Sequence, residues 1–197
     1  KSSQNVKLAR DTDGTVVNEK TTGITVDTLT IEGNNLNAFA GVNGGYQKDA
    51  NGEYVLDGTG NVILSESAMG LALSNVDFEL AMLTQQGAAT HKWTSLQATA
   101  GSVGFVGLGE DVTIRATDVQ VQINQASVLT DAVVDYSAGK SELMNLTLDG
   151  AKGEYMQASG TLDINVYGFV SVYGDLVVTK SSQNVKLARD TDGTVVN

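Results

Sequence analysis

Residues 161–178 read TLDINVYGFVSVYGDLVV and form the longest stretch of alternating side chains in the chain. Its apolar residues share one parity, with glycine at the two skipped places: Leu162, Ile164, Val166, Val170, Val172, Leu176 and Val178, with Gly168 and Gly174. An apolar period of two is typical of β-strands. A single strand over this range would extend about 56 Å, which exceeds the usual strand length. We therefore predict two or three strand segments of a curved sheet that bend at the glycines.

Aromatic residues occupy the opposite face of this stretch, at Tyr167, Phe169 and Tyr173. Contiguous large apolar groups on a surface usually mark a contact with another layer or molecule. We expect this face to be covered by a second layer or by a neighbouring unit.

Three other segments show the same period of two with an interruption of one residue: GITVDTLTIEG (23–33), LALSNVDF (71–78) and IRATDVQVQI (114–123). One extra residue sends the following side chains to the other face unless the backbone bulges or turns a corner. We predict such a bulge or corner in each segment, after Val26, Leu73 and Ala116.

The remaining segments also favour strands. Residues 79–85 (ELAMLTQ) are compatible with the start of a short helix. Phe78, Leu80 and Met82 also alternate, which favours a strand, so both interpretations stay open. The glycine-rich GSVGFVGLG at 101–109 indicates close backbone approach or bulges rather than a helix. We predict an all-β protein, either an elongated β-solenoid or a rolled, curved sheet, with an antiparallel β-sandwich as the alternative.

The chain contains one segment twice, because KSSQNVKLARDTDGTVVN at 1–18 recurs letter for letter at 180–197. Core packing tolerates many apolar replacements, so folding alone does not require this identity. A tandem array with a period of 179 residues explains it, and an engineered overlap is the alternative. We interpret 1–18 as the end of the preceding repeat or a shared junction strand, 19–179 as one repeat unit, and 180–197 as the segment that opens the next repeat.

The duplicated segment has the pattern of a junction strand. Val6 and Leu8 alternate, and the DTDG at 11–14 is a tight-turn signal. An unpaired strand at either end of a sheet invites another chain to pair with it. We expect the two copies of the segment to share one conformation and the units to join end to end through them.

Composition excludes several classes of function. Apolar residues make up 41 % of the chain, which is enough for a folded core. The net charge of −11 disfavours binding to nucleic acid. The chain has no cysteine, so disulfides do not stabilise it, and no apolar run approaches the roughly 20 residues of a membrane-spanning helix.

Catalytic motifs are missing from the sequence, and we predict that the protein is not an enzyme. His91 is the only histidine, there is no cysteine, and no nucleophile-elbow, zinc-protease or phosphate-loop string occurs. His91 lies in a polar stretch, where a surface histidine is the expected interpretation.

Acidic turns give the most specific signal for a ligand. DTDGT at 11–15 and 190–194, DANGE at 49–53 and DGTGN at 57–61 place oxygen ligands two residues apart beside a glycine, as calcium loops do. Ordinary turn chemistry uses the same residues and is the alternative. The candidate calcium ligands are Asp11, Asp13, Asp49, Asn51, Asp57, Asp190 and Asp192.

Surface glycans are a second candidate partner. Tyr46, Tyr54 and Trp93 are placed either to contact sugars or to cap an edge of the core. Asn145-Leu146-Thr147 matches the acceptor pattern for N-glycosylation.

Residues 160–178, 101–109 and 112–124 (VTIRATDVQVQIN) resemble repeats of very large bacterial extracellular surface proteins of the adhesin kind. The resemblance covers most of residues 24–180. It implies a multi-copy structural role at the cell surface, with frequent calcium dependence, although no RTX nonapeptide GGxGxDxUx is present. We expect a structural tandem repeat of an extracellular fibre, filament or giant surface protein whose partner is itself. The alternative is an adhesin-type or carbohydrate-binding β module.

Overall fold

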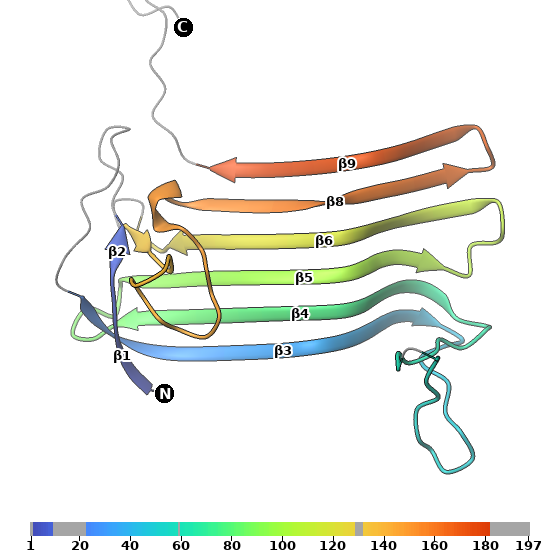
Figure 1. Ribbon diagram of the computed structural model, residues 1–197, viewed down its shortest axis with the longest axis horizontal. Coiled ribbons are helices and arrows are strands. Elements are labelled where there is room, and N and C mark those ends of the chain that lie inside the picture. The colour runs from blue at the N-terminus through green and yellow to red at the C-terminus, as the bar shows by residue number, and fades with distance from the viewer. Residues whose placement is uncertain (1, 10–22, 59, 129–131, 182–197) are drawn as a thin grey trace, which may run out of the picture.

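The computed structural model describes residues 2–9, 23–58, 60–128 and 132–181, and confirms that the protein is all-β. Seven strands form one open antiparallel sheet in the order β1-β3-β4-β5-β6-β8-β9 (Figure 1). The strands are β1 (Ser2–Val6), β3 (Ile24–Val42), β4 (Met69–Gln85), β5 (Lys92–Val106), β6 (Val112–Ala126), β8 (Tyr155–Val166) and β9 (Val170–Ser181). A second, small sheet pairs β2 (Leu8–Ala9) with β7 (Val133–Val134), and a 3-10 turn, η1, spans Gly150–Lys152.

The alternating stretch 161–178 forms two strand segments, as predicted. β8 and β9 are a hairpin in which Val166 pairs with Val170. Tyr167 and Gly168 in the turn have φ values of 50° and 71°, and glycine adopts such values without steric cost. Only Gly168 marks a turn between strands, since Gly174 lies inside β9.

Two of the three predicted phase shifts are present, and the third lies elsewhere. Asn75 in β4 and Asp118 in β6 have φ values of 52° and 51°, at the positions that the sequence indicates. The shift predicted after Val26 is wrong, because β3 pairs with β4 without interruption from Val26 to Gly33. The irregularity of β3 occurs instead at Asn35, with φ of 50°. We call Asn35, Asn75 and Asp118 the phase-shift row.

The phase-shift row keeps apolar side chains on one face of the sheet. Directly opposed residues of antiparallel strands share a face. Through β5 and β6, Leu73 is aligned with Leu162 of β8, and Phe78 is aligned with Ala158. Leu162 and Ala158 are four residues apart in the uninterrupted β8, so they share a face. Leu73 and Phe78, five residues apart, therefore share that face only because β4 changes phase between them.

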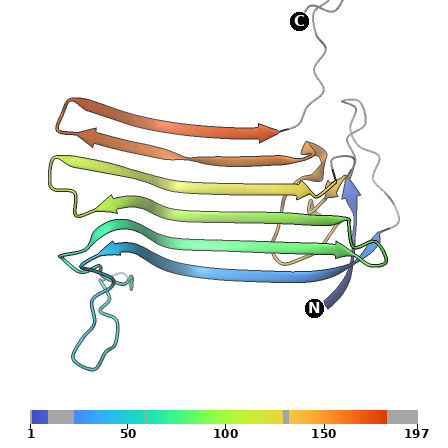
Figure 2. The ribbon, with the colours of Figure 1, turned by 180° about the vertical axis from the view of Figure 1, so that it is seen from behind.

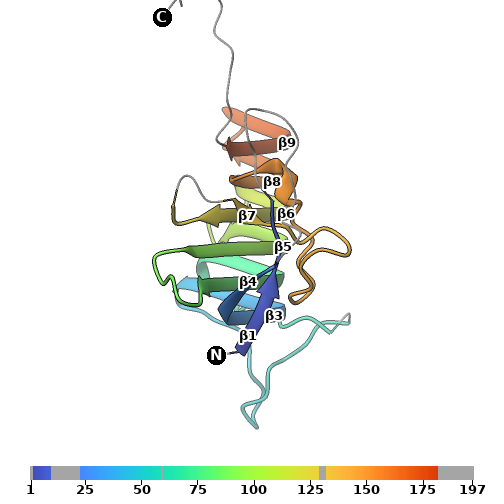
Figure 3. The same cartoon turned by 90° about the vertical axis from the view of Figure 1, so that its left-hand side faces the viewer.

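The hydrophobic core lies at one end of the other face, beneath residues 132–154. We call this segment the cover, and the face it packs on the covered face. Figure 3 shows it on one side of the sheet, next to the strand ends. Trp93 anchors the core: it is 2 % exposed, and its Nε1 donates a hydrogen bond to the Ala132 carbonyl at 2.8 Å. The buried residues are Val6, Leu8, Val26, Ala81, Leu83, Trp93, Val134, Tyr136, Leu143, Leu146, Leu148 and Tyr155.

A buried polar contact fixes the cover to the sheet. The Asn124 side-chain amide donates to the Val134 carbonyl at 2.8 Å and accepts a hydrogen bond from Ser95 at 3.1 Å. Asn124 and Ser95 are both fully buried, so these bonds satisfy polar groups that water does not reach. Val6 and Leu8 belong to the same core, so β1 and β2 pack against the unit that follows them in the chain.

Candidate assembly surfaces

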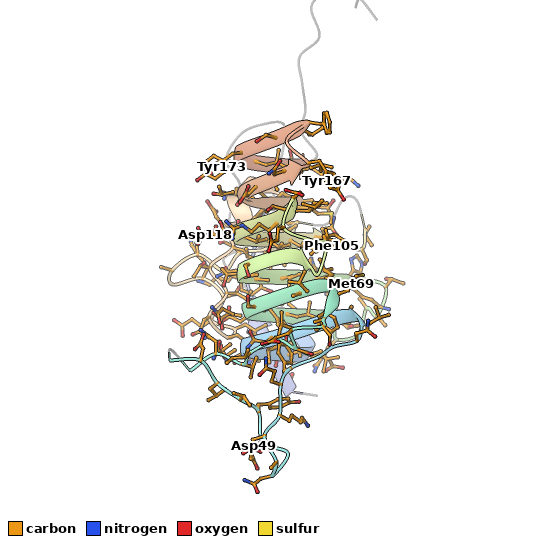
Figure 4. The ribbon with its side chains drawn as sticks, turned by 90° about the vertical axis from the view of Figure 1, so that its right-hand side faces the viewer. Asp49, Met69, Phe105, Asp118, Tyr167 and Tyr173 are labelled. Atoms are coloured by element: carbon orange, nitrogen blue, oxygen red, sulfur yellow. The ribbon has the colours of Figure 1, made fainter. Side chains whose placement is uncertain are left out.

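The face of the sheet opposite the cover is apolar over most of its length and has no covering layer among the described residues. Figure 2 shows this face, which no ribbon crosses. In Figure 4, Met69 and Phe105 point to this side, whereas Asp118 and Tyr173 point to the side of the cover. We call this surface the apolar face.

Cross-strand pairing defines the residues of the apolar face. On β3 to β6 they are Leu29, Ile31, Gly33, Leu36, Ala38, Ala40, Val42, Met69, Leu71, Leu73, Val76, Phe78, Leu80, Met82, Leu96, Ala98, Ala100, Val103, Phe105, Val112, Ile114, Ala116, Val119, Val121 and Ile123. On β8 and β9 they are Met156, Ala158, Gly160, Leu162, Ile164, Val166, Val170, Val172, Gly174, Leu176 and Val178. Asp27 and Lys92, both opposite Thr84, lie on the same face at the end nearest the cover. Lys180, opposite Met156, lies there too. The residues named above, which make up the rest of the face, carry no ionisable side chain.

Exposure of this surface exceeds what a soluble sheet normally leaves open. Leu29 is 52 % exposed, Phe105 is 48 % exposed and Val178 is 57 % exposed. Contiguous apolar patches of this extent mark interaction sites. Beyond the cover, the covered face is polar, and Arg115 bonds Asp163 there at 2.9 Å. The apolar face is therefore the one that lacks a partner.

The sheet also has two open edges. β1 pairs only with Ile24–Thr28 of β3, and no other described strand pairs with residues 29–42 on that side. At the opposite edge, β9 pairs with β8 and with no further described strand. Both edges carry unpaired backbone donors and acceptors, which template the addition of another strand.

The aromatic residues of the β8–β9 hairpin are exposed rather than covered by the described chain. Phe169 is 92 % exposed, Tyr173 is 80 % exposed and Tyr167 is 63 % exposed. Sequence reasoning placed the missing cover over these residues. The structure shows that the alternating aliphatic side chains on the other side of the hairpin lack cover as well. The signal for the apolar face was the run of alternating aliphatic residues in each long strand, which continues on the same face after the phase shifts in β4 and β6.

The described calcium candidates lie in two separate turns of the arm formed by residues 43–68. Asp49 Oδ1 accepts hydrogen bonds from the N–H groups of Asn51 and Glu53, both at 2.9 Å. The N–H groups of Glu53 and Asn51 thereby lower the pKa of the Asp49 carboxyl. Asp57 Oδ1 accepts in the same way from the N–H of Asn61 at 2.9 Å. These carboxylates cap turns, which is what ordinary turn chemistry predicts.

Metal ligation stays a prediction of the sequence pattern. In the described ranges, no three His, Cys, Asp or Glu side chains are grouped so as to hold a metal ion. Asp11, Asp13, Asp190 and Asp192 lie outside the described residues.

The three aromatic residues proposed for glycan contact are dispersed. Trp93 is buried in the core and is not accessible to a glycan. Tyr46 and Tyr54 form an edge-to-face pair in the arm, with ring centroids 6.2 Å apart. Lys48 Nζ lies 4.7 Å from the ring centroid of Tyr54, which is 54 % exposed. Only the arm therefore presents an aromatic group to solvent among these three.

The chain shows no match to any known protein family, and no curated protein or solved structure is significantly similar to it. In the part of the chain that the structure describes, no helix is both long and apolar enough to span a bilayer.

Proposed function

We propose that the protein is a structural repeat of an extracellular fibre, filament or giant surface protein, and that its partners are further copies of the same chain. The two edges and the apolar face of the sheet have no partner among the described residues, and this supports the proposal. Repeat proteins bury such surfaces only against their neighbours. The identical residues 1–18 and 180–197 indicate that the neighbours are copies of the same unit.

The open edges lie at opposite ends of the strand order, so each copy has one free edge on each side. Contact between two different surfaces of identical units is heterologous, and it produces an open filament when the rotation does not close a ring. End-to-end addition through these edges therefore gives growth in one direction.

The apolar face requires a second contact, which we assign to the apolar face of another copy. The result is a two-layer β-sandwich, with sheets about 10 Å apart. Away from its end nearest the cover, the apolar face carries no ionisable side chain, so two acidic chains can pack there without burying charge. In Figure 2 the direction of the strands changes little from one strand to the next, so the sheet has little twist. Sheets with little twist are usually stabilised by stacking.

Removal of residues 180–197 tests the proposed assembly. We expect the shortened chain to form smaller particles, or none, in light scattering, and to unfold at a lower temperature. A chain of unchanged length, in which a Gly/Ser-rich segment replaces residues 182–197, controls for mass and should also assemble poorly. Unchanged particle size and melting temperature in both variants would show that the segment is a passive tail and that end-to-end assembly through it is wrong.

A further inference from the structure

We infer that β9 of one copy and β1 of the next form a single continuous strand, which joins β8 of the first copy to β3 of the second. This inference rests on the proposed function and deepens it, because it specifies the residues that pair at each junction. It follows from the register of the two outermost strands.

Strand direction permits the continuous strand. Each neighbouring pair in the sheet is antiparallel, and β1 and β9 are six steps apart, so they run in the same direction. β9 has β8 on one side, and β1 has β3 on the other side (Figure 1). Ser181, the last residue of β9, is the copy of Ser2, the first residue of β1. When the Ser2 position of a second copy coincides with Ser181 of the first, the β3 of the second copy lies along the free edge of β9.

The faces of the sheet also agree across the junction. Ser181 is opposite the buried Tyr155, and it therefore lies on the covered face. Gln4 is opposite the buried Val26 and lies on the covered face too. Ser2, of which Ser181 is the copy, lies two residues before Gln4 in β1. Strand alternation puts Ser2 and Gln4 on one face, so β9 and the β1 of the next copy present the same face without a rotation between them.

The register of the junction follows from the pairing of β1 with β3. Partners in that pair have residue numbers that add up to 30, as in Ser2 with Thr28. Since the copy lies 179 residues further on, β9 and the next β3 pair where their numbers add up to 209. The pairs that result are Lys180 with Leu29, Thr179 with Thr30, Val178 with Ile31, Val177 with Glu32 and Leu176 with Gly33 of the next copy.

A bulge at Asn35 continues this register to the end of the strands. At the β6–β8 boundary, the positive φ of Asp118 coincides with one extra residue in β6. Asn35 of β3 has the same φ region, and β9, like β8, is uninterrupted. One extra residue in β3 there gives the pairs Leu36 with Gly174, Ala38 with Val172 and Ala40 with Val170.

Side-chain size supports the proposed register. All the pairs that involve Ile31, Gly33, Leu36, Ala38 and Ala40 lie on the apolar face of both copies. Each glycine in them meets a leucine, Gly33 with Leu176 and Gly174 with Leu36. The apolar face thus continues from copy to copy without a gap, and six strands form the repeating unit of the sheet.

Disulfide trapping tests the register in a two-unit chain, in which residues 19–197 follow a complete 1–197. Thr179→Cys in the first unit and Thr30→Cys in the second are directly opposed in the proposed register. Opposed positions meet the Cα separation that a disulfide requires, and the natural chain has no cysteine to interfere. A matched control pairs Thr179→Cys with Glu32→Cys of the second unit, two residues away on the same face.

We expect the opposed pair to oxidise at least about tenfold faster than the control pair, because disulfide geometry tolerates little displacement. Intact mass and peptide mapping identify the bond. Faster oxidation of the control pair, or no bond in a two-unit chain whose 197-residue parent still assembles, overturns the register and leaves the proposed function standing. A parent that does not assemble, together with no bond, overturns both.

Discussion

At the residue scale, Asp135 holds the cover in shape. Its Oδ1 accepts hydrogen bonds from the hydroxyl of Ser137 at 2.6 Å, the N–H of Ser137 at 3.0 Å and the N–H of Gly150 at 3.2 Å. Burial raises the pKa of this carboxyl, but the hydrogen bonds from Ser137 and Gly150 outweigh burial and the net pKa is lowered. A carboxylate whose pKa is lower in the folded state stabilises the fold above its unfolded pKa.

Replacement of Asp135 should therefore destabilise the protein in a pH-dependent way. We expect Asp135→Ala to lose about 1.5–3 kcal/mol of unfolding free energy at pH 7, the range for hydrogen bonds to a charged group. The loss should shrink as the pH falls below about 4 and through the folded pKa, because the wild-type carboxyl is then protonated too. Urea unfolding at pH 7 and pH 3 measures the difference. The exposed Glu142 provides the control, since Glu142→Ala should change little. A loss that does not depend on pH would contradict this role for the carboxylate.

At the scale of the elements, the phase-shift row decides which face each strand presents. Asp118 has φ of 51°, a region that asparagine, aspartate and glycine adopt more readily than β-branched residues. We expect Asp118→Val to cost about 1–3 kcal/mol through backbone strain, whereas Asp118→Gly should be close to neutral. Gln120→Val is the matched control in extended backbone of the same strand and should be neutral or slightly stabilising. Urea midpoints of the three variants give the comparison. Equal midpoints for Asp118→Val and Gln120→Val would show that the row is not strained.

At the scale of the whole molecule, the apolar face should control how many sheets a particle contains. Val121 lies on this face in β6, and its sequence neighbour Gln122 lies on the covered face. We expect Val121→Lys to separate two-layer particles into single sheets, because burying an unpaired ammonium between sheets is costly. Gln122→Lys should leave the layers together. Mass per unit length from electron microscopy distinguishes one sheet from two. A Val121→Lys particle with the wild-type mass per length would exclude this face as the contact between layers.

Local sequence patterns are sufficient to predict the all-β class of the protein and most of its strand positions. The period of two in residues 161–178, interrupted at Gly168, is sufficient to predict the β8–β9 hairpin, because alternation and turn residues are local properties. The shifts at Asn75 and Asp118 were also visible, since one inserted residue changes the parity of the apolar residues that follow. The shift in β3 was misplaced for the same reason: the parity also changes after Val26, where the apolar residues pass from the core to the opposite face without a bulge.

Which face of the sheet is covered could not be predicted from local patterns. Alternation separates the two faces of a strand, but it does not say which of them faces a core. The core formed under residues 132–154, where Trp93, Leu83 and Tyr155 happen to lie on the less apolar face near the strand ends. The register that brings Ser181 into the place of Ser2 also required the pairing of β1 with β3 and of β9 with β8. Such pairing depends on contacts between residues far apart in the chain, which no local pattern encodes.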